Sequence, residues 1–529
     1  MENRLRILLL RPRPPKETIG LQHVMICEPL ELEYLVGNID KAKASVKIID
    51  MILEKKPIEF FINKYKPHIV GMTAYITHVG AVKEMARKIK CLSNKTITVV
   101  GGVHAEVVPE DFTSKYIDYI ICSNPVETFI KIIDRVRAGV DTKEIDKTYI
   151  KSNDNQSHLS SCCRDRKDIG DTYIKSNDNQ PHLSSCCRDI KDIGDTYIKS
   201  NDNQPRLANC CRDTKEIDGI YIKGKKHIRT SSYNILPPDR SSVKRYRKKY
   251  YYMFHNPCAL IKTSLGCPYT CSFCFCKEIT GGKYFARKID EVMEELESIK
   301  EREIYIVDDD FLFNEDRLNL FCDELEKRNI HKRFLVYGRA DFIASHEKVI
   351  GRLSRHGLSA VIVGVESVRE KDLKDFNKRS SLENNEKAIR ILQKYGIELY
   401  ATMILQPDFT KKDFRQIEDY IIGLNVSFVN LQPLTPLPGT EIYDDYKDKI
   451  LVSRKDYAMW DLAHIVLKPK YMSIRQYYYQ IIKTYARIVL RPDNIIKMLK
   501  KYGIKEVAKM WWGSQFVSLQ YIGKIIRGR

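Results

Sequence analysis

Residues 259–274 read ALIKTSLGCPYTCSFC, a short apolar run that leads into a loop with three cysteines. Further apolar runs follow at intervals, separated by amphipathic stretches of helical spacing. These runs are IYIVDDD, FLVYGRAD, AVIVGVES, ELYATMILQ and FVNLQPLTPLPG. Short, continuously apolar runs predict buried strands, and the stretches between them predict helices. Six such units predict a partial (β/α)6 barrel over residues 259–446, with its site at the carboxyl ends of the strands.

The three cysteines of this loop are spaced C-x3-C-x2-C, at Cys267, Cys271 and Cys274. Three thiolates in one short loop can hold three irons of a 4Fe-4S cluster and leave the fourth iron open for another ligand. A zinc site would need a fourth protein ligand. We interpret the nearby Cys276 as a bystander or as a thiol that contacts a ligand. A buried group of unrelated thiols is the alternative.

An earlier segment, residues 1–141, alternates apolar runs and amphipathic stretches in the same way. The runs are RILLL, VKIID, HIVGMT, ITVVGG and YIDYIIC, which predict a doubly wound, Rossmann-like parallel sheet. Ligands of such sheets bind beyond the carboxyl ends of the strands. Those ends fall at residues 11–20, 73–78, 101–105 and 122–127.

Between the two segments the chain repeats itself with a period of 24, and TYIKSNDNQ recurs at Thr148, Thr172 and Thr196. Adjacent cysteine pairs recur in phase. Near-identical copies do not suit a packed core, so we interpret residues 142–225 as a polar surface insertion, with an accessory metal site as the alternative. Residues 226–258 read as a proline-bearing linker, and residues 447–529 as a basic helical region.

The net charge of +20 favours an anionic partner, and half of it lies in residues 471–529, with twelve Lys and Arg against two acidic residues. Two adjacent tryptophans, Trp511 and Trp512, accompany these charges, which suggests a peripheral contact with a membrane. A nucleic-acid-binding protein is the alternative, but no base-stacking motif accompanies the charge, and we expect no nucleic acid partner. We expect a cytoplasmic protein, because fifteen cysteines occur without an export signal and no apolar run could span a membrane.

The cysteine loop resembles the signature of the radical S-adenosylmethionine (SAM) superfamily, C-x3-C-x-aromatic-C, with Phe273 as the aromatic residue. The later strands follow in the order of that family. The resemblance implies a 4Fe-4S cluster whose open iron chelates SAM and whose electron cleaves it to a 5′-deoxyadenosyl radical. It also implies SAM contacts, for which helix caps and a solvated ion pair are the structural alternatives. The implied contacts are Phe273, Asp308, Asp309, Asp310, Arg339 and Glu366.

Residues 1–141 resemble the cobalamin-binding domain that precedes many members of this superfamily, through VGMTAYITHVG and VVGGVHAEVVPEDF. The D-x-H-x-x-G pattern of a lower histidine ligand is absent, so the resemblance implies cobalamin without a protein imidazole on cobalt. Where relatives read G-E-G-E, this chain has SNPVE at residues 123–127, which keeps only the final glutamate. The implied cobalamin contacts are Thr73, Tyr75, Thr77, Gly101, Gly102, His104, Ser123 and Glu127.

Within the superfamily, LPPDRSSVKRYRKKYYY, LENNEKAIRILQKYGIELYA and LTPLPGTEIYDD most resemble the hopanoid carbon-3 methylase group. This resemblance implies methylation of an unactivated carbon of a lipid-like or small-molecule substrate. The radical would remove a hydrogen atom, methylcobalamin would supply the methyl group, and a second SAM would remethylate the cobalt. An external electron donor such as flavodoxin or ferredoxin would be needed. The alternative is a cobalamin-binding radical SAM enzyme that rearranges, cyclises or couples its substrate.

Overall fold

The computed structural model describes residues 4–20, 23–139, 217–223 and 236–528. The described residues belong to one compact unit. The repeats and their cysteine pairs lie outside the described residues. Of the expected insertion, the structure describes residues 217–223, where the backbone N–H of Tyr221 donates to the carbonyl of Ile120 at 2.8 Å.

The N-terminal segment forms a five-stranded sheet in which every neighbouring pair of strands is parallel. The strand order is β3-β1-β4-β5-β6, so the chain order reverses direction between β1 and β4. The expected doubly wound sheet is confirmed. The strands are β1 (Leu5–Arg11), β3 (Ala44–Asp50), β4 (Ile69–Thr73), β5 (Ile97–Gly101) and β6 (Tyr119–Ile120).

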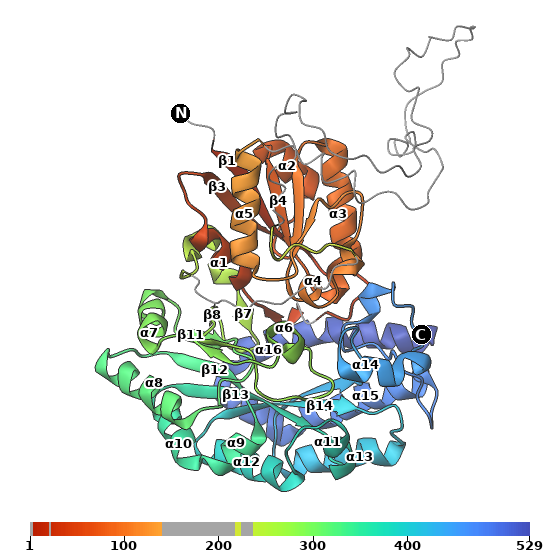
Figure 1. The fold of residues 1–529 in the computed structure, drawn as a ribbon. Helices are drawn as coiled ribbons and strands as arrows, with labels where there is room; N and C mark the ends of the chain where they lie inside the picture. The colour runs from red at the N-terminus through yellow and green to blue at the C-terminus, as the bar shows by residue number, and fades with distance from the viewer. Residues whose placement is uncertain (1–3, 21–22, 140–216, 224–235, 529) are drawn as a thin grey trace, which may run out of the picture. The chain divides into compact units, whose positions relative to one another are not determined.

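Helices cover both faces of this sheet, as Figure 1 shows in red and orange. Helix α2 packs on α3, and α1 packs on α5, one pair for each face. Leu8, Val70 and Val100 from the strands join the α2 and α3 side chains in one buried apolar cluster. The helices are α1 (Leu30–Asn38), α2 (Ile58–Tyr65), α3 (Val79–Leu92) and α5 (Pro125–Arg137).

The second sheet has six parallel strands in the order β15-β14-β13-β12-β11-β8, which confirms the partial barrel. The strands are β8 (Cys258–Ile261), β11 (Glu303–Ile306), β12 (Arg333–Gly338), β13 (Leu358–Glu366), β14 (Glu398–Leu405) and β15 (Phe428–Pro433). The helices between them are α7 (Ile289–Ser298), α8 (Glu315–Lys327), α9 (Ala340–Ser345), α10 (Glu347–Arg355), α11 (Glu370–Asp375), α12 (Leu382–Lys394) and α13 (Lys411–Gly423).

Alternate residues of the barrel strands serve two different apolar clusters. Ile261, Ile304 and Val336 belong to the main core with the helices. Their neighbours Leu260 and Tyr305 belong to an inner cluster on the other face of the sheet. The period of two follows from strand geometry. The inner cluster also takes residues from outside the barrel, namely Tyr252 of β7 (Tyr251–Tyr252) and Met498 and Tyr502 of the last helix.

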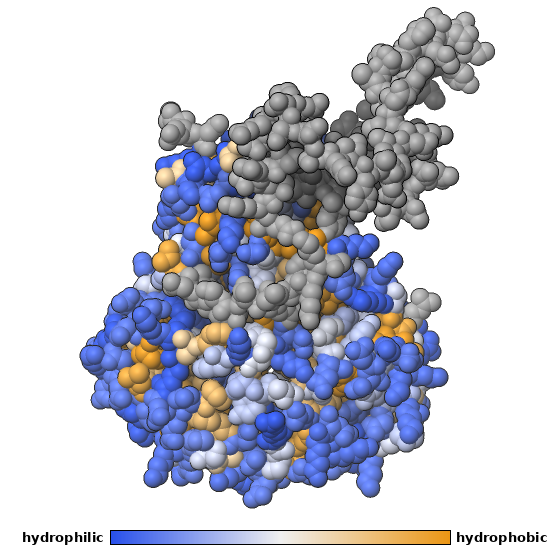
Figure 2. All heavy atoms as spheres, in the orientation of Figure 1, coloured by the Kyte–Doolittle hydropathy of each residue, from blue (hydrophilic) through white to orange (hydrophobic). Residues whose placement is uncertain are grey.

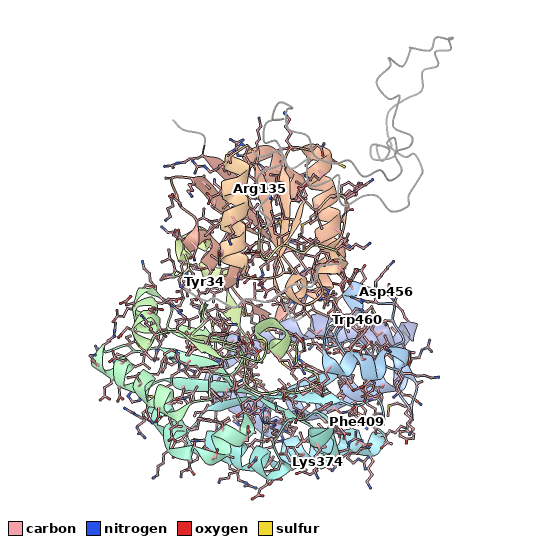
Figure 3. The ribbon with its side chains drawn as sticks, in the orientation of Figure 1. Tyr34, Arg135, Lys374, Phe409, Asp456 and Trp460 are labelled. Atoms are coloured by element: carbon pink, nitrogen blue, oxygen red, sulfur yellow. The ribbon has the colours of Figure 1, made fainter. Side chains whose placement is uncertain are left out.

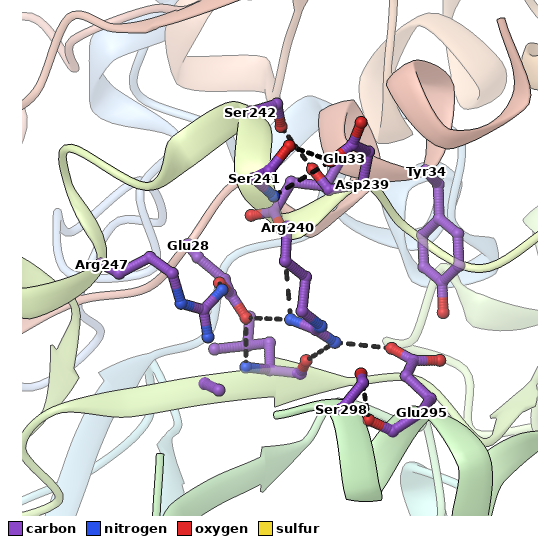
Figure 4. Close-up of polar contacts among 12 residues, drawn as sticks. Glu28, Glu33, Tyr34, Asp239, Arg240, Ser241, Ser242, Arg247, Glu295 and Ser298 are labelled. Atoms are coloured by element: carbon purple, nitrogen blue, oxygen red, sulfur yellow. Dashed lines mark hydrogen bonds and ion pairs between the residues drawn. The ribbon is translucent and has the colours of Figure 1, made fainter. Parts of the chain in front are cut away.

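The outer edge of β8 is closed by two charged side chains from elsewhere in the chain, shown in Figure 4. The backbone N–H of Leu260 donates to Glu28 Oε1 at 2.5 Å, and Arg240 Nη2 donates to the Leu260 carbonyl at 2.7 Å. Arg240 also donates to Glu28 at 2.8 Å and to Glu295 at 2.5 Å, while Arg247 donates to Glu28 at 2.9 Å. Arg240 lies within the expected linker, so the described part of that linker takes part in packing. An edge strand otherwise presents unpaired backbone groups.

Two long helices follow the barrel, α15 (Ile474–Val489) and α16 (Pro492–Arg527). Helix α15 packs on α13 and on α16. Gly503 has a φ of 77° inside α16, where the helix kinks. Trp460, labelled in Figure 3, is buried ahead of these helices and packs near Tyr443. Among the described residues, no helix is both long and apolar enough to cross a bilayer.

Candidate functional site

The cysteine loop follows β8 and is fixed by contacts along its length. Gly266 has a φ of 82°, and a Cβ there would lie 2.0 Å from the carbonyl oxygen of Lys283, so only glycine fits. The backbone N–H of Ser272 donates to the carbonyl of Phe376 at 3.2 Å, and the carbonyl of Ser272 accepts from the N–H of Ile442 at 3.1 Å. Both partners come from segments that follow later barrel strands. The barrel therefore sets the position of the loop.

The three thiols of the loop are close enough to influence one another's pKa. Burial raises the pKa of Cys267 to about 12, with further increases from Asp310, Cys274 and Cys271. Burial also raises the pKa of Cys271. Within the part of the chain that the structure describes, no three His, Cys, Asp or Glu side chains converge as a single metal ion would need. This donor set fits a 4Fe-4S cluster, in which each thiolate binds a different iron.

Cys276 is close enough to Cys274 to change the pKa of that thiol. A hydrogen bond from the Cys276 thiol lowers the pKa of Cys274. The Cys276 sulfur also lies 3.5 Å from Asp309 Oδ1. These contacts favour the interpretation of Cys276 as a thiol that contacts a cluster ligand, here Cys274, over its interpretation as a bystander.

The three aspartates after β11 have different surroundings. Asp308 is buried and accepts three hydrogen bonds of 2.6 Å, from the backbone N–H and hydroxyl of Thr263 and from the hydroxyl of Ser264. Asp309 accepts from the backbone N–H of Gly266 at 2.8 Å. Both therefore tie β11 to the cysteine loop and its approach, which is a structural role other than the helix cap considered for them from the sequence.

Asp310 differs, because neither of its carboxylate oxygens has a hydrogen-bond partner among the described residues although the side chain is only 2% exposed. Burial raises its pKa to about 8, against the opposing attraction of Arg339 and Lys378. A buried polar group without a partner is costly and needs an explanation. A cationic ligand next to Asp310 would supply one.

Arg339 follows β12 and lies against the cysteine loop. It forms two hydrogen bonds of 3.0 Å with Asp341, and its guanidinium stacks 3.7 Å from the ring centre of Tyr269. Its Nη1 lies 3.9 Å from the sulfur of Cys271. Phe273 packs edge-on against Phe376 at 5.2 Å.

Glu366, at the end of β13, has a φ of 63° and forms a buried ion pair of 2.9 Å with Lys378. The carbonyl of Lys378 accepts from Arg339. Attraction from Glu366 and Cys271 raises the pKa of Lys378 despite its burial. Lys378 is a site residue that the sequence analysis missed, since it stands in a loop without a recognisable motif.

The expected cobalamin residues lie at the carboxyl edge of the N-terminal sheet. Six of them lie at strand ends or just after them, and the other two, His104 and Glu127, form ion pairs within the domain. Gly102 has a φ of 101°, and a Cβ there would lie 2.7 Å from the backbone nitrogen of Ala74, so the loops after β4 and β5 touch. Thr73 and Ser123 are buried at strand ends, and Tyr75 is exposed. Gly101 is the last residue of β5, and Thr77 lies in a short 3-10 helix (Ile76–His78) that follows β4.

His104 and Glu127 already have partners within the domain. His104 Nε2 lies 2.9 Å from Asp111, and Glu127 forms an ion pair of 2.8 Å with Lys131 one helical turn later. Glu31 of α1 was not among the predicted residues; it is exposed, and its carboxylate is attracted by Arg11 and hydrogen-bonded by Thr73. Glu31 faces Thr73, so it adds a carboxylate to this edge.

Two family models match the chain, the B12 binding domain over residues 18–132 and the radical SAM superfamily over residues 261–421. Each match lies on one of the two parallel sheets. Residues 261–421 therefore form a radical SAM domain, and residues 18–132 form a B12-binding domain ahead of it. The cofactors of this chain are a 4Fe-4S cluster, SAM and cobalamin.

Among curated proteins, the chain is 30% identical to the hopanoid C-3 methylase of Methylococcus capsulatus over 247 residues, 47% of each protein. The match thus spans about half the length of that relative. The chain is 23% identical to an uncharacterized methyltransferase of Pyrococcus horikoshii over 503 residues, 93% of this chain and 94% of that protein.

Two solved structures share the fold over nearly the whole chain. OxsB, a cobalamin-dependent SAM radical enzyme, matches with a TM-score of 0.62 at 14% identity, over 98% of this chain and 72% of its own. TsrM of Kitasatospora setae, a radical SAM methyltransferase, matches with a TM-score of 0.60 at 14% identity, over 97% of this chain and all of its own. The two-domain arrangement of this chain is therefore a known one.

Proposed function

We propose that the protein is a cobalamin-dependent radical SAM methylase that transfers a methyl group to an unactivated carbon of a lipid-like, hopanoid-type substrate. The observation that carries the proposal is that a B12-binding domain and a radical SAM domain occur together in one chain. The similarity to hopanoid C-3 and C-2 methylases supports the substrate class. When bound, the three cofactors supply a 5′-deoxyadenosyl radical and a methyl group.

In this proposal the chain's own residues hold and orient the cofactors. Cys267, Cys271 and Cys274 bind the cluster. Asp310, the unpartnered carboxylate, would accept a hydrogen bond from the amino group of SAM, and the Lys378 ammonium would attract the SAM carboxylate. Both side chains are buried, so little water would screen their charges and their electrostatic contacts with SAM would be strengthened.

Arg339 acts in this proposal by positioning other residues. Its guanidinium is already engaged by Asp341, Tyr269 and Cys271, and it holds the carbonyl of Lys378. It therefore fixes the loop that carries Lys378 against the loop that carries the cysteines. Glu366 has the same kind of role, since its ion pair sets the direction of the Lys378 side chain.

The protein would need an external electron donor of low potential, such as flavodoxin or ferredoxin, to reduce its cluster. A lipid-like substrate resides in a membrane, so we also propose that the protein works at a membrane surface as a peripheral protein of the cytoplasm. Both partners follow from the proposed chemistry.

The test is anaerobic turnover of the reconstituted protein with a hopanoid, cobalamin, a reductant and SAM that carries a deuterated methyl group. We expect a product heavier by one labelled methyl group and two SAM molecules consumed for each product. The variant with alanine at Cys267, Cys271 and Cys274 is the control and should cleave no SAM. A product without the label would refute methyl transfer and favour rearrangement, cyclisation or coupling.

A further inference from the structure

The outward face of α16 carries large apolar side chains that no other part of the described structure covers. Ile504 is 73% exposed, Trp512 64%, Leu519 62% and Ile526 71%. Trp511, Phe516 and Ile522 are also exposed. Trp512, Phe516, Leu519 and Ile526 are spaced by four, three and seven residues, which places them on one stripe of a helix. Figure 2 shows apolar atoms at the surface beside the C-terminus, where α16 ends.

The opposite face of the same helix is firmly packed. Gly513 is buried, and a Cβ there would lie 2.2 Å from the carbonyl oxygen of His23. Tyr521 is buried in the main core, with its ring 5.9 Å from that of Tyr478. Gln520 donates to the carbonyl of Thr18 at 3.1 Å. These contacts fix the rotation of the helix about its axis, so the apolar stripe is held outward by the fold.

Charge is distributed unevenly along α16. Residues 510–523 contain no charged side chain, whereas the preceding part contains Lys497, Lys500, Lys501, Lys505 and Lys509. Only Asp493 and Glu506 oppose them within the helix. Lysines next to an exposed apolar stripe with two tryptophans match the chemistry of an anionic bilayer, where tryptophan lies at the headgroup boundary and lysines meet phosphates.

We propose that the outward face of α16 binds the surface of a bilayer that contains anionic phospholipid. The apolar stripe from Ile504 to Ile526 lies at the boundary between headgroups and acyl chains, and Lys500 and Lys505 meet the phosphates. The first part of the helix places Met498 and Tyr502 in the inner cluster of the barrel. One helix thus joins the bound membrane to the barrel interior. The use of this contact rests on the proposed lipid-like substrate, but the binding itself does not.

The experiment is co-sedimentation of the full-length holoprotein with vesicles, under anaerobic conditions. The probes are vesicles of phosphatidylcholine with phosphatidylglycerol, and vesicles of phosphatidylcholine alone. We expect binding to the anionic vesicles that falls when salt is raised well above about 0.1 M, because salt screens the lysine contacts. Binding to the neutral vesicles should be weaker by about tenfold.

Two variants separate the contributions. Trp511→Ser with Trp512→Ser and Leu519→Ser should weaken binding to anionic vesicles by about tenfold or more. Lys500→Glu with Lys505→Glu should remove the preference for anionic vesicles. Since all five side chains are exposed, both variants should fold and retain cofactors.

Leu320→Ser, at an exposed leucine of α8, is the matched control and should bind as the unchanged protein does. Equal binding by the tryptophan variant would refute the proposal, as would absence of binding by the unchanged protein. A dimer in solution that the tryptophan variant converts to a monomer, without vesicle binding, would assign the face to a second copy and would also refute it. Binding without turnover would leave the membrane face standing and count against the proposed substrate alone.

Discussion

Replacing Asp310 with asparagine should make the cluster-free protein more stable, and increasingly so as the pH rises. The Asp310 carboxyl, with an ordinary pKa of 3.8, has that pKa raised to about 8 by burial, against the attraction of Arg339 and Lys378. The folded state therefore binds one more proton than the unfolded state between these two pH values. The free energy of unfolding must then fall as the pH rises through this window.

The size of the effect follows from the shift. One pKa unit corresponds to about 1.4 kcal/mol, so the cost of Asp310 reaches at most about 4 kcal/mol at pH 7. It reaches at most about 6 kcal/mol above pH 8, where the carboxyl is ionised in both states. Asparagine has the same shape and no charge, so Asp310→Asn should remove most of this cost and its pH dependence.

The assay is the urea midpoint of both proteins at a series of pH values from about 5 to about 8. The exposed Asp456, labelled in Figure 3, offers the control Asp456→Asn, which should shift the midpoint little at any pH. With cofactors present, SAM binding near pH 6 should release about one more proton from the unchanged protein than from the Asp310 variant. A gap between the two proteins that stays constant with pH would refute the reasoning.

Three further outcomes are expected. Arg240→Met should cost about 3–5 kcal/mol in urea unfolding, because it removes one partner from each of the buried carboxylates Glu28 and Glu295. Lys394→Met, at an exposed ion pair with Glu347, should cost much less, and equal losses in the two variants would contradict this. Gly102→Ala should reduce the amount of cobalamin that stays bound through gel filtration, because the new Cβ would clash with the backbone of Ala74. The control Gly80→Ala, where a Cβ meets no other atom, should retain about one equivalent of cobalamin. Cys276→Ala should keep the iron and sulfide content of the unchanged protein, and loss of the cluster would make that thiol a ligand.

The two parallel sheets could be predicted from the sequence because their strands are short apolar runs with local patterns. The cysteine loop could be predicted too, since its three thiols lie within eight residues. Contacts between distant segments leave no such pattern. Glu28 and Arg240 are 212 residues apart, and nothing near Arg240 in the sequence distinguishes a buried arginine from one in a solvated linker.

Individual roles at the site were harder to predict than its location. Three consecutive aspartates look alike in the sequence, yet Asp308 accepts three hydrogen bonds, whereas Asp310 has no hydrogen-bond partner in the described part of the chain. The difference depends on the direction in which each side chain points after β11, which decides whether it meets the hydroxyls and N–H groups of the cysteine loop region. Lys378 was missed for a similar reason, since only the fold brings its ammonium group to Glu366.

The closure of the β8 edge by Glu28 and Arg240 bears on how this chain could be divided. A fragment that begins at residue 259 would lose both side chains and leave the N–H and carbonyl of Leu260 free to pair with another chain. Such a fragment should aggregate edge to edge, although it would contain the whole radical SAM family match. The radical SAM domain therefore depends on side chains that lie outside its own family match. A shortened protein would need other groups to pair the backbone of Leu260.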